Sequence, residues 1–183
     1  MRNNLPLYLA LVLLTQCSKC KNDPRPRDPA AALPPATQTG ANTFGCLVNG
    51  QPYTPKGNNG TSNLYILYDA GFRGGALGIQ TYRIDGNRRQ YLSIDMAPVT
   101  TTGIYSFARP AGICTANYAD TPGVANGCNL IYSDQDVAYR SGQLAITKFD
   151  TRNRIVSGTF SFKLLQAGCD TLKVTQGRFD AKL

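Results

Sequence analysis

The side chains that could carry chemistry in this 183-residue chain are aspartates, tyrosines and cysteines, because the sequence contains no histidine. Without histidine, the usual general base and metal ligand is absent, so a Ser/His or Cys/His nucleophile pair cannot form. Two carboxylates could still act together, as in glycoside hydrolysis. Every acidic residue is Asp, however, and most of them lie in or beside expected turns, where Asp is favoured. We therefore expect no catalytic residue and no enzyme, and an Asp-dependent hydrolase is the least favoured alternative.

Two short patterns resemble ligand sites and fall short of them. Asp134 and Asp136 could supply oxygens to calcium, but the glycine and terminal Glu of a recognised calcium loop are missing. A solvated turn is the favoured interpretation. The glycine-rich stretch 71–75 lacks the Gly-Lys-Ser/Thr ending of a phosphate-binding loop, and no helix is expected after it. We expect no metal and no cofactor.

The tyrosines are the remaining candidates for ligand binding. A tyrosine combines an apolar ring with a polar hydroxyl, so several of them could line a groove that stacks on sugars or grips a peptide. Ordinary packing within strands explains the same residues and is the favoured interpretation. The candidates for a groove are Tyr65, Tyr68, Tyr82, Tyr91 and Tyr105, within a wider set that includes Tyr118, Tyr132 and Tyr139.

The charge of the chain does not indicate a nucleic-acid partner. The formal net charge is +8, but the basic residues of the body are scattered singly, with Arg88-Arg89 as the one doublet. A protein that reads nucleic acid normally carries a clustered basic stripe, often with aromatic residues among the charges. We therefore expect a generally soluble basic surface and no nucleic-acid binding.

Residues 1–16 have the layout of a lipoprotein signal peptide. A basic residue near the start precedes an apolar run over 5–14, which is too short for the roughly 20 residues that span a bilayer. The stretch Leu14-Thr15-Gln16-Cys17 then resembles the bacterial lipobox, although Gln16 stands where a small residue is usual. We predict that Cys17 carries fatty acyl chains such as palmitate and holds the protein at the outer membrane, facing the periplasm or the cell surface. The alternative is a signal peptide cleaved elsewhere.

After the lipidated cysteine, residues 17–42 form a polar tether. Prolines recur between positions 24 and 35, and they disfavour a regular helix or a central strand. We expect an extended, semi-stiff spacer that lifts the domain off the membrane. The all-β domain is then expected over 43–183.

Export implies an oxidising compartment, so the four cysteines of the body could pair in any of three ways. We favour Cys114–Cys128, which would close the loop 115–127, and Cys46–Cys169, which would join the first strand to the last hairpin. In the chain-entropy model, a loop of the first size is worth about 3 kcal/mol. Structural zinc is the competing idea, but the body has no CxxC pair and no histidine. Cys20 is left without a partner.

Alternation with a period of two is the main structural signal. Across 155–164, one face carries Val156, Gly158, Phe160, Phe162 and Leu164, which is typical of a strand with one buried side. Gln176-Gly177 interrupts the last strand and predicts a β-bulge. The expected strands are 63–69, 76–84, 90–97, 104–107, 129–133, 142–149, 155–164 and 171–183. The pattern predicts an antiparallel β-sandwich of about nine strands, with a closed lipocalin-like barrel as the alternative.

The C-terminal strands also resemble a known family. The stretches 146–150, 155–162 and 174–180, together with Phe44-Gly45-Cys46-Leu47-Val48-Asn49-Gly50, are similar to an uncharacterised family of small Bacteroidetes lipoproteins. In that family an all-β domain follows a lipidated cysteine. The resemblance covers most of 43–183 and implies export, lipidation and a β fold. No activity is established for that family, so no functional residue is carried over.

These observations predict a membrane-anchored envelope lipoprotein that binds a glycan, a peptide or a partner protein without catalysing a reaction. The alternative is a purely structural envelope protein. A binding module should have a concave patch rich in Tyr and Arg, whereas a structural protein should have flat polar faces or a protein-sized apolar patch. The sequence fixes neither the ligand nor the oligomeric state.

Overall fold

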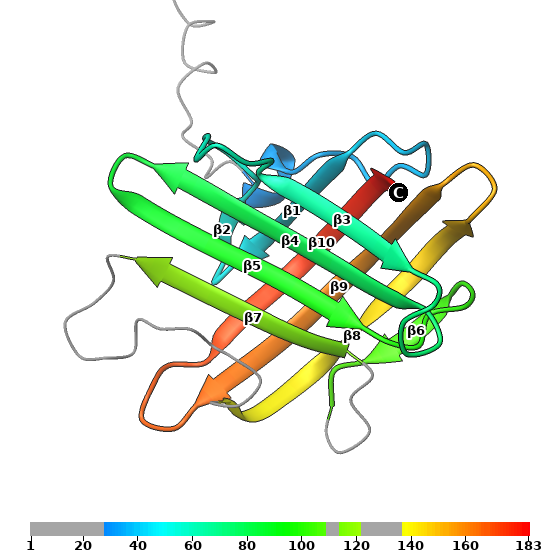
Figure 1. Cartoon of the computed structure of the whole chain (residues 1–183). Coiled ribbons are helices and arrows are strands. Elements are labelled where there is room, and N and C mark those ends of the chain that lie inside the picture. The colour runs from blue at the N-terminus through cyan, green and yellow to red at the C-terminus, as the bar shows by residue number, and fades with distance from the viewer. Residues whose placement is uncertain (1–27, 109–113, 122–136) are drawn as a thin grey trace, which may run out of the picture.

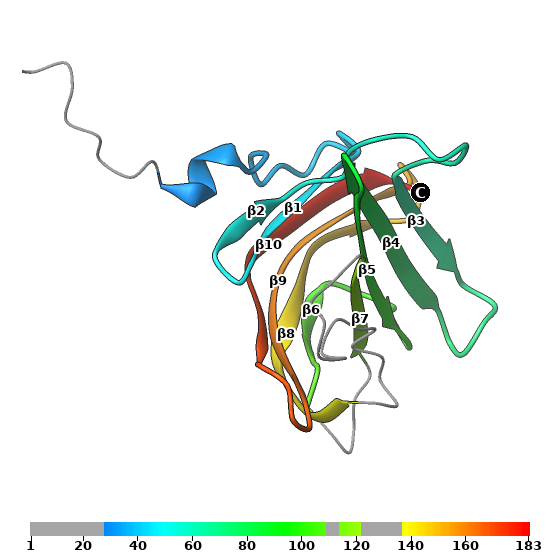
Figure 2. The same cartoon turned by 90° about the vertical axis from the view of Figure 1, so that its left-hand side faces the viewer.

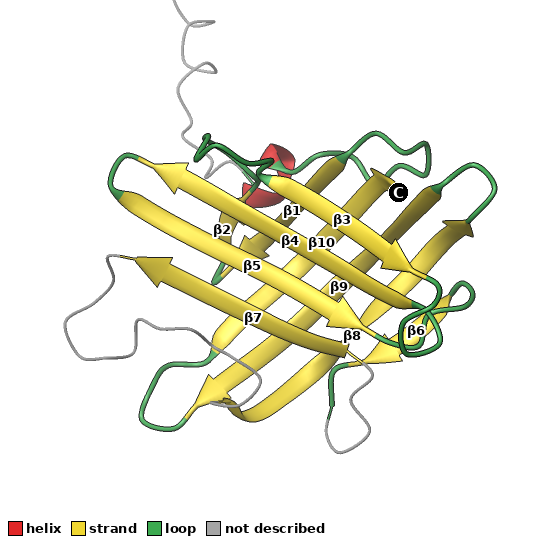
Figure 3. Cartoon of the chain, viewed as in Figure 1, coloured by secondary structure: helices red, strands yellow, loops and turns green. Residues whose placement is uncertain are grey.

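The computed structural model describes residues 28–108, 114–121 and 137–183. Within these ranges the chain is built almost wholly from strands, with one short 3-10 helix, η2 (Pro29–Ala32), before them (Figure 3). The strands are β1 (Thr43–Val48), β2 (Gln51–Tyr53), β3 (Leu64–Asp69), β4 (Ala76–Asp85), β5 (Arg88–Met96), β6 (Gly103–Ser106), β7 (Cys114–Thr121), β8 (Val137–Asp150), β9 (Ile155–Gln166) and β10 (Leu172–Lys182).

The strands form two antiparallel sheets that face each other. The large sheet has six strands in the order β2-β1-β10-β9-β8-β6, and the small sheet has four in the order β3-β4-β5-β7. Figure 1 looks onto the small sheet, whose strands cross those of the large sheet behind it, and Figure 2 shows the curved large sheet beside the small one. The predicted β-sandwich is confirmed over the closed-barrel alternative, with ten described strands where about nine were expected.

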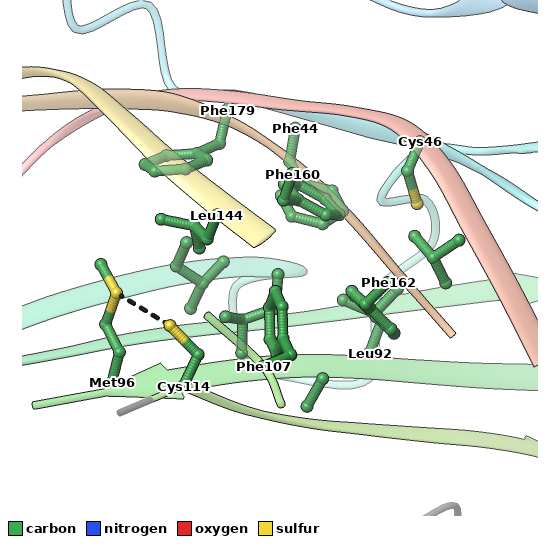
Figure 4. Packing of buried hydrophobic residues seen from close by; sticks show 14 of the residues in the cluster. Phe44, Cys46, Leu92, Met96, Phe107, Cys114, Leu144, Phe160, Phe162 and Phe179 are labelled. Carbon is green, nitrogen blue, oxygen red and sulfur yellow. Dashed lines mark hydrogen bonds between the residues drawn. The ribbon is translucent and has the colours of Figure 1, made fainter. Parts of the chain in front are cut away.

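The core lies between the two sheets, because alternate residues of each strand point inward. The small sheet contributes Leu77 and Ile79, while the large sheet contributes Phe160 and Phe162. Aromatic rings pack closely there: the Phe107 and Phe162 centroids are 5.0 Å apart. Figure 4 shows these rings together with the aliphatic side chains that fill the space around them. The alternation predicted for 155–164 is confirmed, since Val156, Gly158, Phe160, Phe162 and Leu164 are all buried.

The predicted β-bulge is also confirmed. The register between β9 and β10 shifts between Val174 and Gly177, and Gln176 adopts a positive φ of 52°. A bulge of one residue moves the next side chains to the other face. Val174 and Phe179 therefore both reach the core although their sequence parity differs.

One predicted loop is wrong. The stretch 115–127 was expected to be a loop, but its first part belongs to β7, which pairs with β5 along the edge of the small sheet. Ala116 and Tyr118 point into the core from this strand. The alternation was hard to recognise because one of the inward residues is a small alanine. The strand expected at 129–133 lies outside the described residues.

Both predicted disulfides are wrong. Cys46 and Cys114 are free, buried thiols, so neither Cys46–Cys169 nor Cys114–Cys128 is formed. Figure 4 shows the physical reason, since both thiols point into the apolar core, where the Cys114 sulfur lies 3.6 Å from the Met96 sulfur. Cys169 is disulfide-bonded, and its partner lies outside the described residues.

Residues 28–42, here called the N-terminal segment, pack against the outer face of the large sheet. Leu33 is buried, and Pro34 sits so close to Gly45 that a Cβ there would lie 2.6 Å from the proline Cδ. Arg178 of β10 donates a hydrogen bond to the Pro34 carbonyl at 3.4 Å. In Figure 2 this segment lies beside β1 and β2, on the side of the molecule away from the small sheet. Across the described ranges, no helix has the length and apolarity needed to cross a membrane.

Candidate functional site: a groove on the small sheet

A groove of about 480 Å³ lies on the outer face of the small sheet. Its floor is formed by strand residues, and one wall is formed by the loop between β3 and β4. The lining includes Tyr65, Leu67 and Asp69 of β3, Phe72 and Arg73 of the loop, Gly78 and Gln80 of β4, Asp95 of β5 and Thr115 of β7. Arg140 of β8 also contributes to the lining.

Strand register explains why residues far apart in sequence meet in this groove. Leu67 lies opposite Gly78, Gly78 opposite Asp95, and Asp95 opposite Thr115, so the four form one row across the sheet. Each lies between neighbours that point into the core, and the row therefore faces outward. A parallel row brings Tyr65 opposite Gln80.

Gly78 creates the hollow in the middle of the row. It carries no side chain, and a Cβ built on it would lie only 3.2 Å from a carboxylate oxygen of Asp95. Any larger residue would fill the space between Leu67 and Asp95. Glycine within a strand often marks a place where another group approaches the backbone closely.

The wall of the groove is held in place by backbone hydrogen bonds at both ends. At its start, Asp69 Oδ1 accepts hydrogen bonds from the amides of Gly71 and Phe72, at 2.8 and 3.2 Å. At its end, the Gly75 amide donates to the Phe72 carbonyl, and the Gly75 carbonyl accepts from Val99 at 2.7 Å. Phe72 and Arg73 are thus presented by a loop whose path is fixed on both sides.

Gly75 is the residue of this wall at which an added side chain would meet the closest contact. Its φ is +105°, and a Cβ there would lie 2.5 Å from the Val99 carbonyl oxygen. The Tyr68 hydroxyl occupies the remaining space, where it donates to that same carbonyl at 3.0 Å. The loop can therefore pack this closely against Tyr68 and Val99 only because Gly75 has no side chain.

Asp95 is the distinctive polar group of the groove. Its carboxylate is half-buried, and no described residue donates a hydrogen bond to it or forms an ion pair with it. Burial raises the pKa of Asp95 above its ordinary value. A carboxylate that has lost part of its hydration without gaining a protein partner is free to accept hydrogen bonds from a ligand.

Exposed apolar side chains gather beside this carboxylate. Tyr65 is 49% exposed and Phe72 is 57% exposed, and both line the groove. Four of the six large hydrophobic residues that are exposed in the described chain belong to the small sheet or its β3–β4 loop, namely Tyr65, Leu67, Phe72 and Tyr91. The large sheet has no comparable concentration among the residues described.

Comparison with known proteins places the chain in a family. A family model described as "Domain of unknown function (DUF6252)" matches residues 68–181, which is more than half of the chain. The chain belongs to this family. The DUF6252 match runs from the end of β3 into β10 and contains most of the groove, including Phe72, Arg73 and Asp95. No significant match was found among curated proteins or among solved structures.

The five candidate tyrosines are divided between two surfaces and the core. Tyr65, Tyr82 and Tyr91 share the outer face of the small sheet, where Tyr82 lies opposite Tyr91 with ring centroids 6.4 Å apart. Tyr65 alone of these lines the groove. Tyr82 is buried at its hydroxyl, which donates to the Thr61 carbonyl at 2.6 Å and accepts from the Asn59 amide.

The other two candidate tyrosines lie elsewhere. Tyr68 points inward and packs edge-on against Phe149, with ring centroids 5.0 Å apart. Tyr105 belongs to β6 of the large sheet, and its hydroxyl donates to the Thr101 carbonyl at 2.7 Å. The structure therefore does not bring all five candidates into one groove.

Sequence reasoning missed Asp95, Gly78 and the loop pair Phe72-Arg73. Gly78 gave a signal, since it interrupts an otherwise regular strand. The stretch 71–75, whose glycines do not complete a phosphate-binding pattern, supplies Phe72 and Arg73 to the wall of the groove. Within the described ranges, no three His, Cys, Asp or Glu side chains are grouped so as to hold a metal ion. Asp134 and Asp136 lie outside those ranges.

Proposed function

We propose that this chain is a lipid-anchored cell-envelope protein whose β-sandwich is a non-enzymatic binding module, with the groove on the small sheet as its ligand site. The single observation that carries the binding role is the groove, which is lined both by exposed aromatic rings and by a carboxylate with no hydrogen-bond or ion-pair partner among the described residues. Surface carboxylates and rings are common, but their convergence in one concavity is typical of a ligand site.

The anchor is proposed from the sequence. The apolar run over 5–14 ends directly before Leu14-Thr15-Gln16-Cys17, which supports cleavage before Cys17 and acylation of its thiol. The likeness of the C-terminal strands to small Bacteroidetes lipoproteins supports the same location at the outer membrane. The Tyr and Arg content of the groove supports a glycan, a peptide or a partner protein as ligand over a purely structural role.

The anchor is tested by growing cells with a clickable fatty acid and measuring label on the protein. Cys17→Ala should abolish labelling and release the chain from the membrane fraction, because the thiol is the proposed acyl acceptor. Cys20→Ala is the matched control, since it removes a cysteine three positions away, and it should label like the wild type. Equal labelling of all three proteins would show that Cys17 is not acylated.

The binding role is tested with the full-length protein purified in detergent. It is applied to a glycan array and to an immobilised peptide library, and it is used as bait for envelope proteins. We expect reproducible capture by one of the three. If the protein binds nothing in any of the three assays, the proposed binding role is contradicted, and a purely structural envelope protein remains as the alternative.

A further inference from the structure

We infer that the ligand of the groove is a neutral saccharide, held by the Asp95 carboxylate on one side and by the rings of Tyr65 and Phe72 on the other. This inference rests on the proposed binding role and names the chemical class of the ligand.

The polar floor of the groove calls for a ligand that both donates and accepts hydrogen bonds. The Asp95 carboxylate only accepts when it is ionised, and no described side chain satisfies it. The Gln80 amide, which also faces the groove, offers donors as well as an acceptor. Hydroxyl groups match both, because each hydroxyl supplies one donor and two acceptor sites.

The apolar side of the groove calls for a ligand with a flat face free of polar groups. Tyr65 and Phe72 expose about half of their surface or more, although aromatic rings gain from burial. A pyranose ring has such a face of C–H groups, while its hydroxyls project around the rim. A ligand that stacks on Tyr65 and directs its hydroxyls toward Asp95 satisfies both sides of the groove at once.

The charges of the groove favour a neutral ligand. Asp69 and Asp95 both line it, and a phosphate or carboxylate ligand would approach them with the same sign of charge. Arg73 and Arg140 also line it, so a cationic ligand would meet like charge as well. Acidic and basic residues are thus mixed in one small site, so neither an anionic nor a cationic ligand would meet a uniformly attractive electrostatic potential.

The size and rigidity of the groove fit a short stretch of sugar chain. Its volume of about 480 Å³ lies within the roughly 300–1,000 Å³ of small-molecule sites. The wall carrying Phe72 is fixed by Asp69 and Gly75, so little ordering is needed when the ligand binds. Exposed Tyr91 lies on the same outer face of the small sheet, outside the lining of the groove.

The test uses the full-length protein and an array of defined neutral and acidic oligosaccharides, followed by titration calorimetry with the neutral oligosaccharide that binds most strongly. Tyr65→Ala should weaken its affinity at least tenfold because the stacking face is lost. Asp95→Asn should weaken it to a similar extent, since the amide keeps the shape but replaces one acceptor by a donor.

The matched control is Tyr139→Ala, because Tyr139 is 56% exposed on β8 of the other sheet. This variant should bind the oligosaccharide within twofold of wild type. Unchanged thermal midpoints of the variants show that folding is not the cause.

The outcomes separate this inference from the proposed function. Binding of peptides that depends on Tyr65, with no saccharide bound, overturns the saccharide inference and keeps a binding module. Strong binding of acidic sugars alone overturns the neutral ligand. If both Tyr65→Ala and Asp95→Asn still bind the saccharide as wild type does, the binding site does not lie in the groove.

Discussion

Asp180 and Thr37 stand 143 positions apart in the chain, yet the Thr37 hydroxyl donates a 2.6 Å hydrogen bond to an Asp180 carboxylate oxygen. The amides of Thr39 and Gly40 donate to the same carboxylate at 2.9 and 2.8 Å, and Ser157 donates from the neighbouring strand at 2.7 Å. Asp180 is consequently only 1% exposed although it lies on the outer side of the large sheet. One carboxylate thus fixes the N-terminal segment to the last strand.

Replacing Asp180 by Asn should destabilise the fold by about 2–4 kcal/mol, because several donors aimed at a buried carboxylate would lose a charged acceptor. Urea unfolding followed by tyrosine fluorescence measures the change. Asp85→Asn is the control, since Asp85 is exposed and forms surface ion pairs with Lys56 and Arg83. The control should unfold at nearly the wild-type urea concentration. Equal effects of the two changes would contradict the importance of the Asp180 contacts.

The same carboxylate predicts how stability depends on pH. Burial alone would raise the pKa of Asp180, but the hydrogen bonds from Thr37, Ser157, Thr39 and Gly40 outweigh it and hold the pKa far below its usual range. Since the folded pKa lies below the unfolded value of about 3.9, the stabilisation is present above that pH and is lost as the pH falls further. The unfolding free energy of wild type should therefore drop below about pH 4, and Asp180→Asn should show a shallower decline in the same acid titration.

Cys46 and Cys114 should resist modification in the folded protein. Burial raises the pKa of the Cys46 thiol far above its usual range and that of Cys114 to about 12, so neither forms the reactive thiolate at neutral pH. Mass spectrometry after iodoacetamide treatment should find both unmodified in buffer and both alkylated in denaturant. Alkylation in buffer would contradict their burial. Failure to alkylate in denaturant without reductant would indicate disulfides.

Gly75→Ala should displace the groove wall. The new Cβ would meet the Val99 carbonyl, and the positive φ adds strain, so we expect a loss of stability beyond about 1 kcal/mol. Gly60→Ala separates the two causes, because Gly60 has a similar φ of +94° but no atom within 4 Å of the added Cβ. Thermal melting should show the larger loss for Gly75→Ala. A larger loss for Gly60→Ala would contradict the close approach at Gly75.

Gly177→Ala tests the bulge on β10. An added Cβ would contact the ring of Phe160, which is buried and cannot move freely, so overpacking should destabilise the fold by about 1–3 kcal/mol. Gly103→Ala is the control, because the nearest atom to its added Cβ is 3.8 Å away. Chemical denaturation of both variants should affect only Gly177→Ala, and an equal effect would argue against tight packing at the bulge.

The strands were predictable because one buried face imposes a period of two on the sequence, as at Phe160 and Phe162. β7 was missed because alanine at an inward position weakens the same signal. The disulfides failed for a different reason. An oxidising compartment would permit pairing, but it does not fix which way a thiol points, and Cys46 and Cys114 each point into the core.

The groove could not be predicted because its polar centre depends on register. Gly78 and Asp95 meet only because β4 and β5 pair as an antiparallel hairpin with one particular alignment. A shift of one residue would turn Asp95 toward the core. Composition and spacing identify tyrosines as candidates, but they do not reveal which of them share a face, and Tyr68 accordingly points inward while Tyr65 does not.

The attachment of the N-terminal segment to the large sheet would shorten the tether of the proposed lipid anchor. With the anchor proposed at Cys17, only residues 18–27 remain between the acylated cysteine and the segment attached to the large sheet. Ten residues reach at most about 35 Å when fully stretched, so an acylated Cys17 would keep the domain within about that distance of the bilayer. If Cys17 is acylated as proposed, the chain would reach the domain on the side of the large sheet, and the small sheet with Tyr65 and Asp95 would face away from the membrane.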